Sequence, residues 1–231
     1  MIIIPLLPDP IIECDFESVY APSDDSYLLI DYFKSKIDHI YFDGIKISEI
    51  NNILDLGTGT GIIAIFFQLI KIENPNFNPK IFASDILEDA IKCAKLNEKR
   101  NNIDNQIQIF HSDLFNSFPE NLKHSFNIIV FNPPYLPSSK FIEQNINKQN
   151  IDYSWDGGLK GYEIIVEFLS AAKTFLNLKK EHFIYCITSS RTDLIELNRI
   201  IINFGYKNRI VEKEHIFFED IVLNRLEYSR Y

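Results

Sequence analysis

The stretch Ile53-Leu54-Asp55-Leu56-Gly57-Thr58-Gly59-Thr60-Gly61 decides how the chain folds. Residues 53–56 are apolar apart from one aspartate and predict a buried strand, whereas residues 60–72 carry the pattern of a helix. Glycine has no side chain and tolerates unusual φ angles, so the backbone of a glycine-rich turn can approach a ligand closely. The stretch therefore predicts a strand, a ligand-binding turn and a helix in succession.

Apolar runs that suit buried strands alternate with helical patterns along the chain. The predicted strands cover residues 53–56, 81–84, 107–110, 127–131 and 183–188, and further helices are predicted around residues 87–94 and 194–204. This alternation indicates a parallel sheet with helices on both faces. Residues 207–212 and 220–227 have no helix between them and predict an antiparallel hairpin at the edge of the sheet. The predicted fold is α/β and Rossmann-like, with five parallel strands and a C-terminal hairpin in one seven-stranded sheet.

Residues 1–50 precede the first strand of this predicted sheet. Within them, residues 24–35 predict a helix that begins after Pro22 and Ser23, and residues 36–51 predict a loop with short pieces of structure. We expect one domain over residues 1–231, in which residues 1–50 form an entry or lid segment and residues 51–231 the catalytic core.

The composition excludes several classes of protein. A net charge of −9 argues against a protein that holds nucleic acid through its own phosphate contacts, because such contacts need a basic surface. Cys14, Cys93 and Cys186 lie far apart and form neither a metal-ligand pair nor a disulfide framework. The start of the chain lacks the basic region of a signal peptide, and no apolar run approaches the ~18 residues of a membrane span. We therefore expect a cytoplasmic protein with no bound metal and no membrane contact.

The glycine spacing and two aspartates indicate the ligand. A dinucleotide site has the spacing G-x-G-x-x-G, whereas Gly57-x-Gly59-x-Gly61 is the tighter form seen when a methionine moiety replaces phosphate. Asp85 ends the next strand, where a carboxylate can accept hydrogen bonds from both ribose hydroxyls. Asp113 follows the third strand and suits the adenine amino group, with Leu114 or Ile86 against the ring. The pattern predicts S-adenosylmethionine; NAD, or a turn and helix caps without a ligand, are the alternatives.

Asn132-Pro133-Pro134-Tyr135 directly follows the apolar run at residues 126–131. An amide nitrogen is a poor nucleophile because its lone pair is delocalised, and two hydrogen-bond acceptors can orient its NH2 group. The side-chain oxygen of Asn132 and the carbonyl of Pro133 can be those acceptors, since the prolines fix the backbone in advance. Tyr135 can stack on a planar substrate. The motif predicts methyl transfer to a planar nitrogen, which adenine, guanine and glutamine all offer.

Three segments make the chain resemble the release-factor glutamine methyltransferases, which methylate the glutamine side chain in the Gly-Gly-Gln loop of class I release factors. They are Tyr20-Ala-Pro-Ser-Asp-Asp-Ser-Tyr-Leu-Leu, Asn132-Pro-Pro-Tyr135 and Trp155-Asp-Gly-Gly-Leu-Lys-Gly161. The resemblance implies the seven-stranded sheet of the S-adenosylmethionine-dependent methyltransferases. It also implies that Tyr20 and Asp25 border the cofactor, together with Asp55, Gly57, Thr58, Gly59 and Gly61 of the glycine-rich stretch.

The chain is most similar to the archaeal and eukaryotic branch of that family, because it has no room for the N-terminal helical domain of bacterial members. Membership of this branch implies a small zinc-binding activator subunit that adds to the edge strand between Ile107 and Phe110. Methylation of an exocyclic amino group of DNA or RNA, or of another protein residue such as lysine, is the alternative activity. A scaffold that binds the cofactor without catalysis is an alternative of a different class.

Among the polar residues outside these motifs, Lys95, Lys99 and Arg100 predict an exposed helical face that contacts solvent alone.

Overall fold

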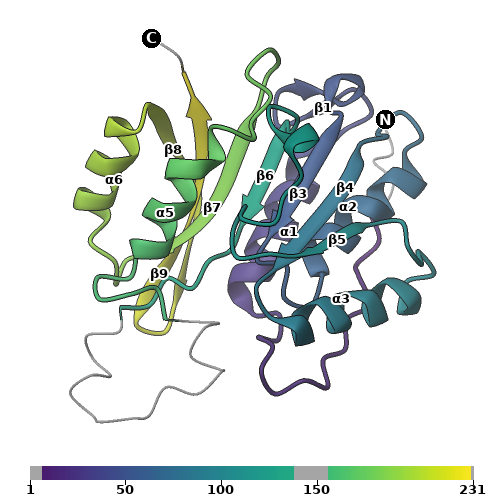
Figure 1. Ribbon diagram of the computed structural model, residues 1–231, viewed down its shortest axis with the longest axis horizontal. Coiled ribbons are helices and arrows are strands. Elements are labelled where there is room, and N and C mark those ends of the chain that lie inside the picture. Colours follow the sequence, from purple (N-terminus) through teal and green to yellow (C-terminus); the bar gives the residue numbers. More distant parts are fainter. Residues whose placement is uncertain (1–6, 138–155, 230–231) are drawn as a thin grey trace.

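The computed structural model describes residues 7–137 and 156–229. Within them, one seven-stranded sheet has the order β5-β4-β3-β6-β7-β9-β8 (Figure 1). The strands are β3 (Asn52–Leu56), β4 (Lys80–Asp85), β5 (Gln108–His111), β6 (Ile128–Phe131), β7 (Phe183–Ser189), β8 (Tyr206–Ile216) and β9 (Glu219–Tyr228). The first five run parallel, and β9 is antiparallel to both β7 and β8. The predicted fold class is confirmed, including the hairpin at the edge.

Helices cover both faces of the sheet. They are α1 (Asp24–Lys36), α2 (Ile62–Glu73), α3 (Glu88–Arg100), α5 (Glu163–Ala172) and α6 (Leu194–Asn203). One apolar cluster packs α1 and α2 against the face that includes Ile53, and a second packs α5 and α6 against the face that includes Leu54. Figure 1 shows α5 and α6 in front of the sheet and α1 behind it. Neighbouring residues of one strand therefore enter opposite halves of the core, as expected of parallel strands buried on both sides.

The observed elements differ from the predicted ones at a few places. Helix α2 begins at Ile62 rather than at residue 60, because Gly61 caps it with a φ of 85°. Helix α5 was not predicted, because its apolar side chains form a nearly continuous run rather than one helical stripe. The remaining predicted strands and helices lie within a few residues of the observed ones.

Residues 37–51 contain a small hairpin, which agrees with the predicted loop with short pieces of structure. It consists of β1 (Tyr41–Phe42), β2 (Ile45–Lys46) and the short 3-10 helix η1 (Ile47–Glu49). The carboxylate of Asp43 in its turn accepts hydrogen bonds from the hydroxyls of Tyr32 at 2.8 Å and Tyr185 at 2.7 Å, and pairs with Arg225 at 3.0 Å. A mostly buried charge needs this full set of partners, and here they join the hairpin to α1, β7 and β9.

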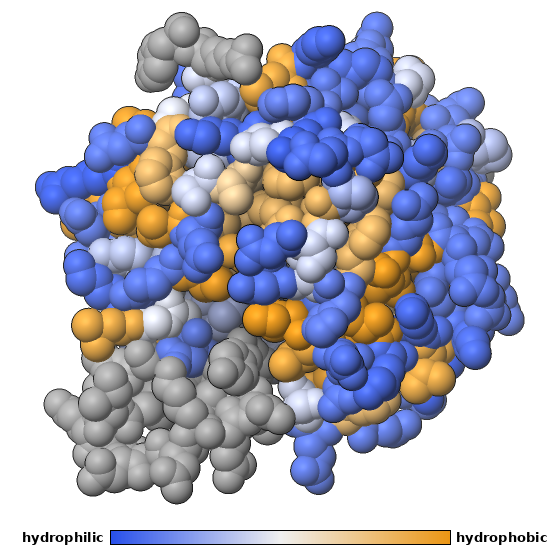
Figure 2. All heavy atoms as spheres, viewed as in Figure 1, coloured by the Kyte–Doolittle hydropathy of each residue, from blue (hydrophilic) through white to orange (hydrophobic). Residues whose placement is uncertain are grey.

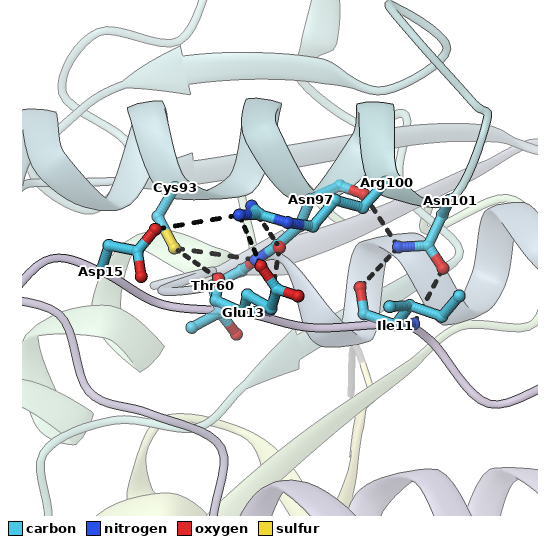
Figure 3. Close-up of polar contacts among 8 residues, drawn as sticks. All are labelled: Ile11, Glu13, Asp15, Thr60, Cys93, Asn97, Arg100 and Asn101. Carbon is cyan, nitrogen blue, oxygen red and sulfur yellow. Dashed lines mark hydrogen bonds and ion pairs between the residues drawn. The ribbon is translucent and has the colours of Figure 1, made fainter.

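The N-terminal segment at residues 11–15 lies along α3 (Figure 3). The side chain of Asn97 accepts a hydrogen bond from the Glu13 backbone amide at 3.1 Å and donates one to the Thr60 carbonyl at 2.9 Å. Asn101 exchanges two hydrogen bonds with the backbone of Ile11, at 2.9 and 2.7 Å. Asn97 therefore joins the entry segment to the glycine-rich turn.

The expectation for Arg100 was wrong, whereas Lys95 and Lys99 are exposed as predicted. The Arg100 guanidinium lies 2.7 Å from a carboxylate oxygen of Glu13, and its side chain is only 28% exposed. The reason is that the entry segment brings a carboxylate to the C-terminal end of α3, where a cation is already favoured.

The described residues contain neither a candidate membrane helix nor a candidate metal site. None of their helices has the length and apolar character needed to cross a membrane. Within the same residues, no group of three or more His, Cys, Asp or Glu side chains is arranged to hold a metal ion.

Candidate active site

A cavity of about 220 Å³ lies at the C-terminal ends of β3, β4 and β6. Ligands of open α/β sheets bind at this edge, where the strand order reverses. The entry segment contributes Val19, Tyr20 and Pro22 to the wall. The sequence-predicted residues that line the cavity are Tyr20, Asp55, Gly57, Thr58, Gly59, Asp85, Ile86, Asp113, Leu114 and Asn132. The structure thus brings together residues that are more than a hundred positions apart in the chain.

The glycine-rich turn forms one wall of this cavity. Gly57, Gly59 and Gly61 have φ angles of 66°, 54° and 85°, in the left-handed region that favours glycine. The Gly59 amide donates a hydrogen bond to a carboxylate oxygen of Asp85 at 2.9 Å. Asp55 accepts hydrogen bonds from the Thr58 hydroxyl at 2.6 Å and from the amide of Ala64 at 3.1 Å. Asp55 therefore holds the turn and the first turn of α2 in a fixed geometry.

Burial raises the pKa of Asp55 and Asp85, the two carboxyl groups beside the turn. Loss of water around Asp55 raises its pKa to about 7, although the hydrogen bonds from Thr58 and Ala64 act in the opposite direction. Burial also raises the pKa of Asp85, against the amide hydrogen bonds of Leu87 and Gly59. A bound cation would favour the ionised form of both groups. The wall is therefore suited to a ligand that carries positive charge.

The far end of the cavity is suited to a nucleoside. One carboxylate oxygen of Asp85 accepts a hydrogen bond from the Leu87 amide at 2.9 Å, and the other accepts one from the Gly59 amide. Each oxygen has a further lone pair that can accept a hydrogen bond from a ribose hydroxyl. Asp113 is exposed beside Leu114, and Ile86 is 47% exposed, so a carboxylate and two apolar side chains border the same space. The residues present fit S-adenosylmethionine. The glycine turn, Asp55 and Asp85 would lie near its cationic part, and Asp113, Leu114 and Ile86 would lie near its adenosine.

Ionisation of Asp55 predicts a pH-dependent affinity for S-adenosylmethionine. Below its pKa of about 7 the carboxyl is protonated, so binding a cation must release that proton and the affinity falls. We expect the dissociation constant to increase by about tenfold between pH 7.5 and pH 6, since one pKa unit corresponds to a factor of ten. Titration calorimetry would measure it. Asp55→Asn should have a nearly flat profile over this range, and an equally steep profile in that variant would contradict the role of Asp55.

Asn132 lies where β6 ends and faces the cavity. Its side-chain oxygen is buried and accepts no hydrogen bond from any residue in the described ranges. A buried amide oxygen without a partner is costly, because proteins satisfy nearly all such groups. The position is therefore suited to a ligand that donates an N–H. Pro134 also lines the cavity, whereas Pro133 does not.

Tyr135 does not line the cavity but is fixed at both its hydroxyl and its backbone. Its hydroxyl donates a hydrogen bond to Asp25 at 3.1 Å, and its carbonyl accepts one from the Thr192 hydroxyl at 3.1 Å. Burial and the nearby Asp25 carboxylate raise the pKa of the phenol. Through these contacts, α1 on one side and the segment before α6 on the other hold the loop at residues 132–135 in place. Stacking of the Tyr135 ring on a substrate remains a prediction.

Asp25 and Gly61 also lie behind the cavity wall rather than in it. Asp25 is buried, and its other oxygen accepts a hydrogen bond from the Ser26 amide at 2.6 Å. A side chain at Gly61 would meet Ala94 of α3 at 3.1 Å. Both residues support the site through their neighbours, and their direct contact with the cofactor remains a prediction.

The glycines after the catalytic loop let a second segment pack against it. The Gly157 amide donates a hydrogen bond to the Leu136 carbonyl at 2.9 Å, and Asp156 lines the cavity. A Cβ added at Gly157 would lie 2.7 Å from the Pro134 carbonyl, and one at Gly161 would lie 2.6 Å from the carbonyl of Tyr135. The sequence singled out this stretch without indicating that it supports the loop or that Asp156 faces the cavity. Trp155 of the same stretch lies outside the described residues.

Removal of the Tyr135 hydroxyl should weaken catalysis moderately. Tyr135→Phe deletes one hydrogen bond to a carboxylate, which contributes about 1.5–3 kcal/mol at most to holding the loop. We expect kcat to fall by about tenfold, with little change in the affinity for S-adenosylmethionine. Asp25→Asn should have a similar effect, and the double variant should be no worse than either single one. Fully additive losses in steady-state kinetics would show that the two side chains act separately.

Comparison with known proteins agrees with this geometry. Residues 36–158 match the methyltransferase small domain family. A protein of Methanocaldococcus jannaschii, provisionally assigned as an N5-glutamine methyltransferase, is 32% identical over 205 residues, which is 89% of this chain and 89% of that protein. A bifunctional methyltransferase of Rickettsia typhi is 36% identical over 204 residues, 81% of this chain but only 36% of its own length.

The fold also matches solved structures. The structure of the Mtq2-Trm112 complex of E. cuniculi, described as responsible for methylation of the eRF1 translation termination factor, superimposes with a TM-score of 0.63 and 24% identity. The match covers 92% of this chain and 99% of that chain, and at this identity it shows the fold alone. The chain therefore belongs to the methyltransferase small domain family, as a member of its S-adenosylmethionine-dependent protein glutamine methyltransferases.

Proposed function

We propose that the protein transfers a methyl group from S-adenosylmethionine to the side-chain amide nitrogen of the glutamine in the Gly-Gly-Gln loop of a class I release factor. The observation that carries the proposal is the buried side-chain oxygen of Asn132, which lies at the cavity that fits the cofactor and has no hydrogen-bond partner within residues 7–137 and 156–229. A primary amide is planar and carries two N–H donors. One of them would supply the hydrogen bond that the Asn132 oxygen lacks within the described residues.

The chain's own residues position the acceptor amide. S-adenosylmethionine, when bound, supplies an electrophilic methyl group on a sulfonium. The Asn132 oxygen accepts one N–H of the glutamine amide, and the carbonyl of Pro133 is the predicted acceptor of the other. In this orientation the nitrogen lone pair would face the methyl group; the C–N bond would form as the methyl–sulfur bond breaks, the neutral thioether S-adenosylhomocysteine would leave, and the amide nitrogen would release one proton to water. No general base is required for this last step.

The surroundings of Asn132 make the arrangement rigid. The Asp25 carboxylate holds the hydroxyl of Tyr135, Thr192 holds its carbonyl, and Gly157 packs against the backbone of the loop. Acceptors that are held in place before the substrate arrives need little reorganisation in the transition state. Orientation of this kind contributes several kcal/mol to lowering a barrier.

Two features support a small activator subunit, bound to form a heterodimer. Strand β5 lies at the edge of the sheet, and in the described residues it pairs only with β4. Apolar side chains gather across the middle of the face drawn in Figure 2, over the strands between α5 and α3. An uncovered strand edge with apolar surroundings favours pairing with another chain. We propose that a zinc-binding partner adds to β5 near Ile107 and Phe110, and the two-chain complex that Mtq2 of E. cuniculi forms with Trm112 supports such an assembly.

The organisation of the chain is part of the proposal. Residues 1–231 act as one methyltransferase domain in the cytoplasm, in which residues 1–50 contribute the entry segment and residues 51–231 the catalytic core. The contacts of Asn97 and Arg100 with residues 11–13 support this arrangement, because they fix the entry segment beside the glycine turn.

Transfer of a labelled methyl group tests the proposed function. The protein would be incubated with labelled S-adenosylmethionine and a class I release factor, with and without a candidate activator. We expect label in the factor and none when the glutamine of its Gly-Gly-Gln loop is changed to asparagine. Label on nucleic acid or on a lysine instead would refute the proposed acceptor. Label that requires the second chain would support the heterodimer.

A further inference from the structure

The tip of the β8–β9 hairpin carries two adjacent phenylalanines that lie in solvent. Phe217 and Phe218 form the two-residue connection between Ile216 and Glu219, and they are 85% and 87% exposed. Phe217 has a φ of 50°. Two-residue hairpin turns favour glycine, asparagine or aspartate at such positions, and a bulky residue there is strained. Exposure and strain together indicate that these side chains do not stabilise the fold and are available to contact a partner.

The tip lies at the same edge of the sheet as the active site. Strand β9 starts beside the C-terminal end of β7, where Ser189 pairs with Ile221 and the Ser190 amide donates a hydrogen bond to Asp220 at 2.9 Å. Three residues along the chain from Ser189, the Thr192 hydroxyl donates to the carbonyl of Tyr135. The hairpin tip is therefore joined to the catalytic loop through the short segment between β7 and α6.

Electrostatics agree with this proximity. Burial and the Asp25 carboxylate are the main causes that raise the pKa of Tyr20 and Tyr135, and the negative charge of Glu219, which directly follows Phe218, acts in the same direction on both. Tyr20 lines the cofactor cavity and Tyr135 belongs to the catalytic loop. The charge of Glu219, the neighbour of Phe218, therefore acts on both the cofactor cavity and the catalytic loop.

Other exposed apolar side chains border the same edge. Leu159 is 58% exposed, and Ile195 in the first turn of α6 is 72% exposed. Lys160 follows Leu159, and the pKa of its ammonium is raised mainly by Tyr162 and to a smaller extent by Glu196 and Asp193 at the start of α6. The rim beside the catalytic loop therefore offers apolar contacts from the segment after the loop, from α6 and from the hairpin tip.

The basic side chains at the base of the tip lie close to carboxylates. Lys213 lies 2.6 Å and His215 lies 2.8 Å from the carboxylate of Asp220. Arg191 lies 3.9 Å from Glu219. Contacts with nucleic acid or with an anionic lipid surface need free cations, and these cations already have acidic partners. A polypeptide surface with an apolar patch is the ligand that fits an aromatic tip of this kind.

We propose that Phe217 and Phe218 dock the polypeptide that carries the acceptor glutamine, by packing on an apolar patch of its folded surface outside the loop that enters the active site. The inference rests on the proposed function, because a substrate loop that reaches Asn132 brings the rest of its protein against this rim. It also implies that recognition is divided. Asn132 selects the amide, whereas the hairpin tip selects the protein.

The test compares the wild-type protein with the double variant Phe217→Gly, Phe218→Ser in the complex with its activator. We expect the KM for the intact release factor to increase by at least tenfold, with kcat and the dissociation constant of S-adenosylmethionine unchanged. With a short peptide that contains only the Gly-Gly-Gln loop, wild type and variant should behave alike. The melting temperature should stay the same or rise, because glycine relieves the strain at residue 217. The matched control is Ile202→Ser, which removes a 54% exposed apolar side chain near the opposite end of α6.

Three results would overturn the inference in different ways. An unchanged KM for the intact factor, with a wild-type enzyme that methylates it, would refute docking by the tip and leave the proposed function standing. Wild-type protein that transfers no methyl group to the factor would refute both. Binding of wild type, but not of the variant, to vesicles of phosphatidylcholine and phosphatidylserine, together with an unchanged KM, would assign the tip to membrane contact.

Discussion

Asn132→Ala should lower kcat for methyl transfer by about 10²–10³-fold, which is the usual cost of removing one fixed hydrogen-bonding group that positions a reacting centre. The affinity for S-adenosylmethionine should change by less than about threefold, because the glycine turn, Asp85 and Asp113 remain in place. The physical reason is that alanine cannot accept an N–H from the acceptor amide, so the nitrogen lone pair is no longer held towards the methyl group. Steady-state kinetics with labelled cofactor and calorimetric binding would measure the two quantities.

The side-chain oxygen of Asn132 has no partner in the described structure, so its removal should not destabilise the fold. An equal or higher melting temperature in Asn132→Ala would separate lost chemistry from lost structure. Asn203→Ala is the matched control, because Asn203 is an exposed asparagine at the end of α6. Turnover that survives in Asn132→Ala would show that another group orients the acceptor.

Gly157→Ala should lower kcat by about a hundredfold, since a displacement of about 1 Å at a reacting group can cost that much. The added Cβ would lie 2.7 Å from the carbonyl of Pro134 and 2.9 Å from the Cα of Tyr135, so the catalytic loop must shift. Binding of S-adenosylmethionine should be weakened much less, because the glycine-rich turn lies elsewhere in the cavity wall.

Gly44→Ala provides the control for Gly157→Ala. A Cβ at Gly44 would meet nothing within 4 Å, and its φ of 95° makes the substitution strained without any contact at the active site. It should therefore lower stability and leave kcat unchanged. Chemical denaturation and single-turnover rates would be measured on both variants. A Gly157→Ala enzyme with a normal single-turnover rate would show that the segment after the loop does not position it.

Local patterns in the chain determined the elements and the kind of ligand. The alternation of strands and helices, the glycine spacing at Gly57 to Gly61, and Asn132 after a buried strand each depend on residues within about ten positions of one another. Helix α5 was not predicted for the same reason, because its continuous apolar run is ambiguous without knowledge of what covers it.

The partners of the site residues depended on the tertiary structure. Asp25 and Tyr135 are 110 positions apart, and only the strand order brings α1 beneath the loop after β6. For the same reason the sequence left Arg100 in solvent, whereas the structure pairs it with Glu13, and the sequence did not indicate the hydrogen bond from Tyr135 to Asp25.

The sequence by itself determined that the chain is an α/β methyltransferase with an Asn132-Pro-Pro-Tyr loop, because periodicity, glycine spacing and proline restraints act on neighbouring residues. Only the tertiary structure decided which groups support that loop and what surface surrounds it. Crossover connections in a parallel sheet carry the C-terminal ends of distant strands to one edge. The support from Gly157, the hydrogen bond from Tyr135 to Asp25 and the position of the hairpin tip at Phe217 therefore follow from topology.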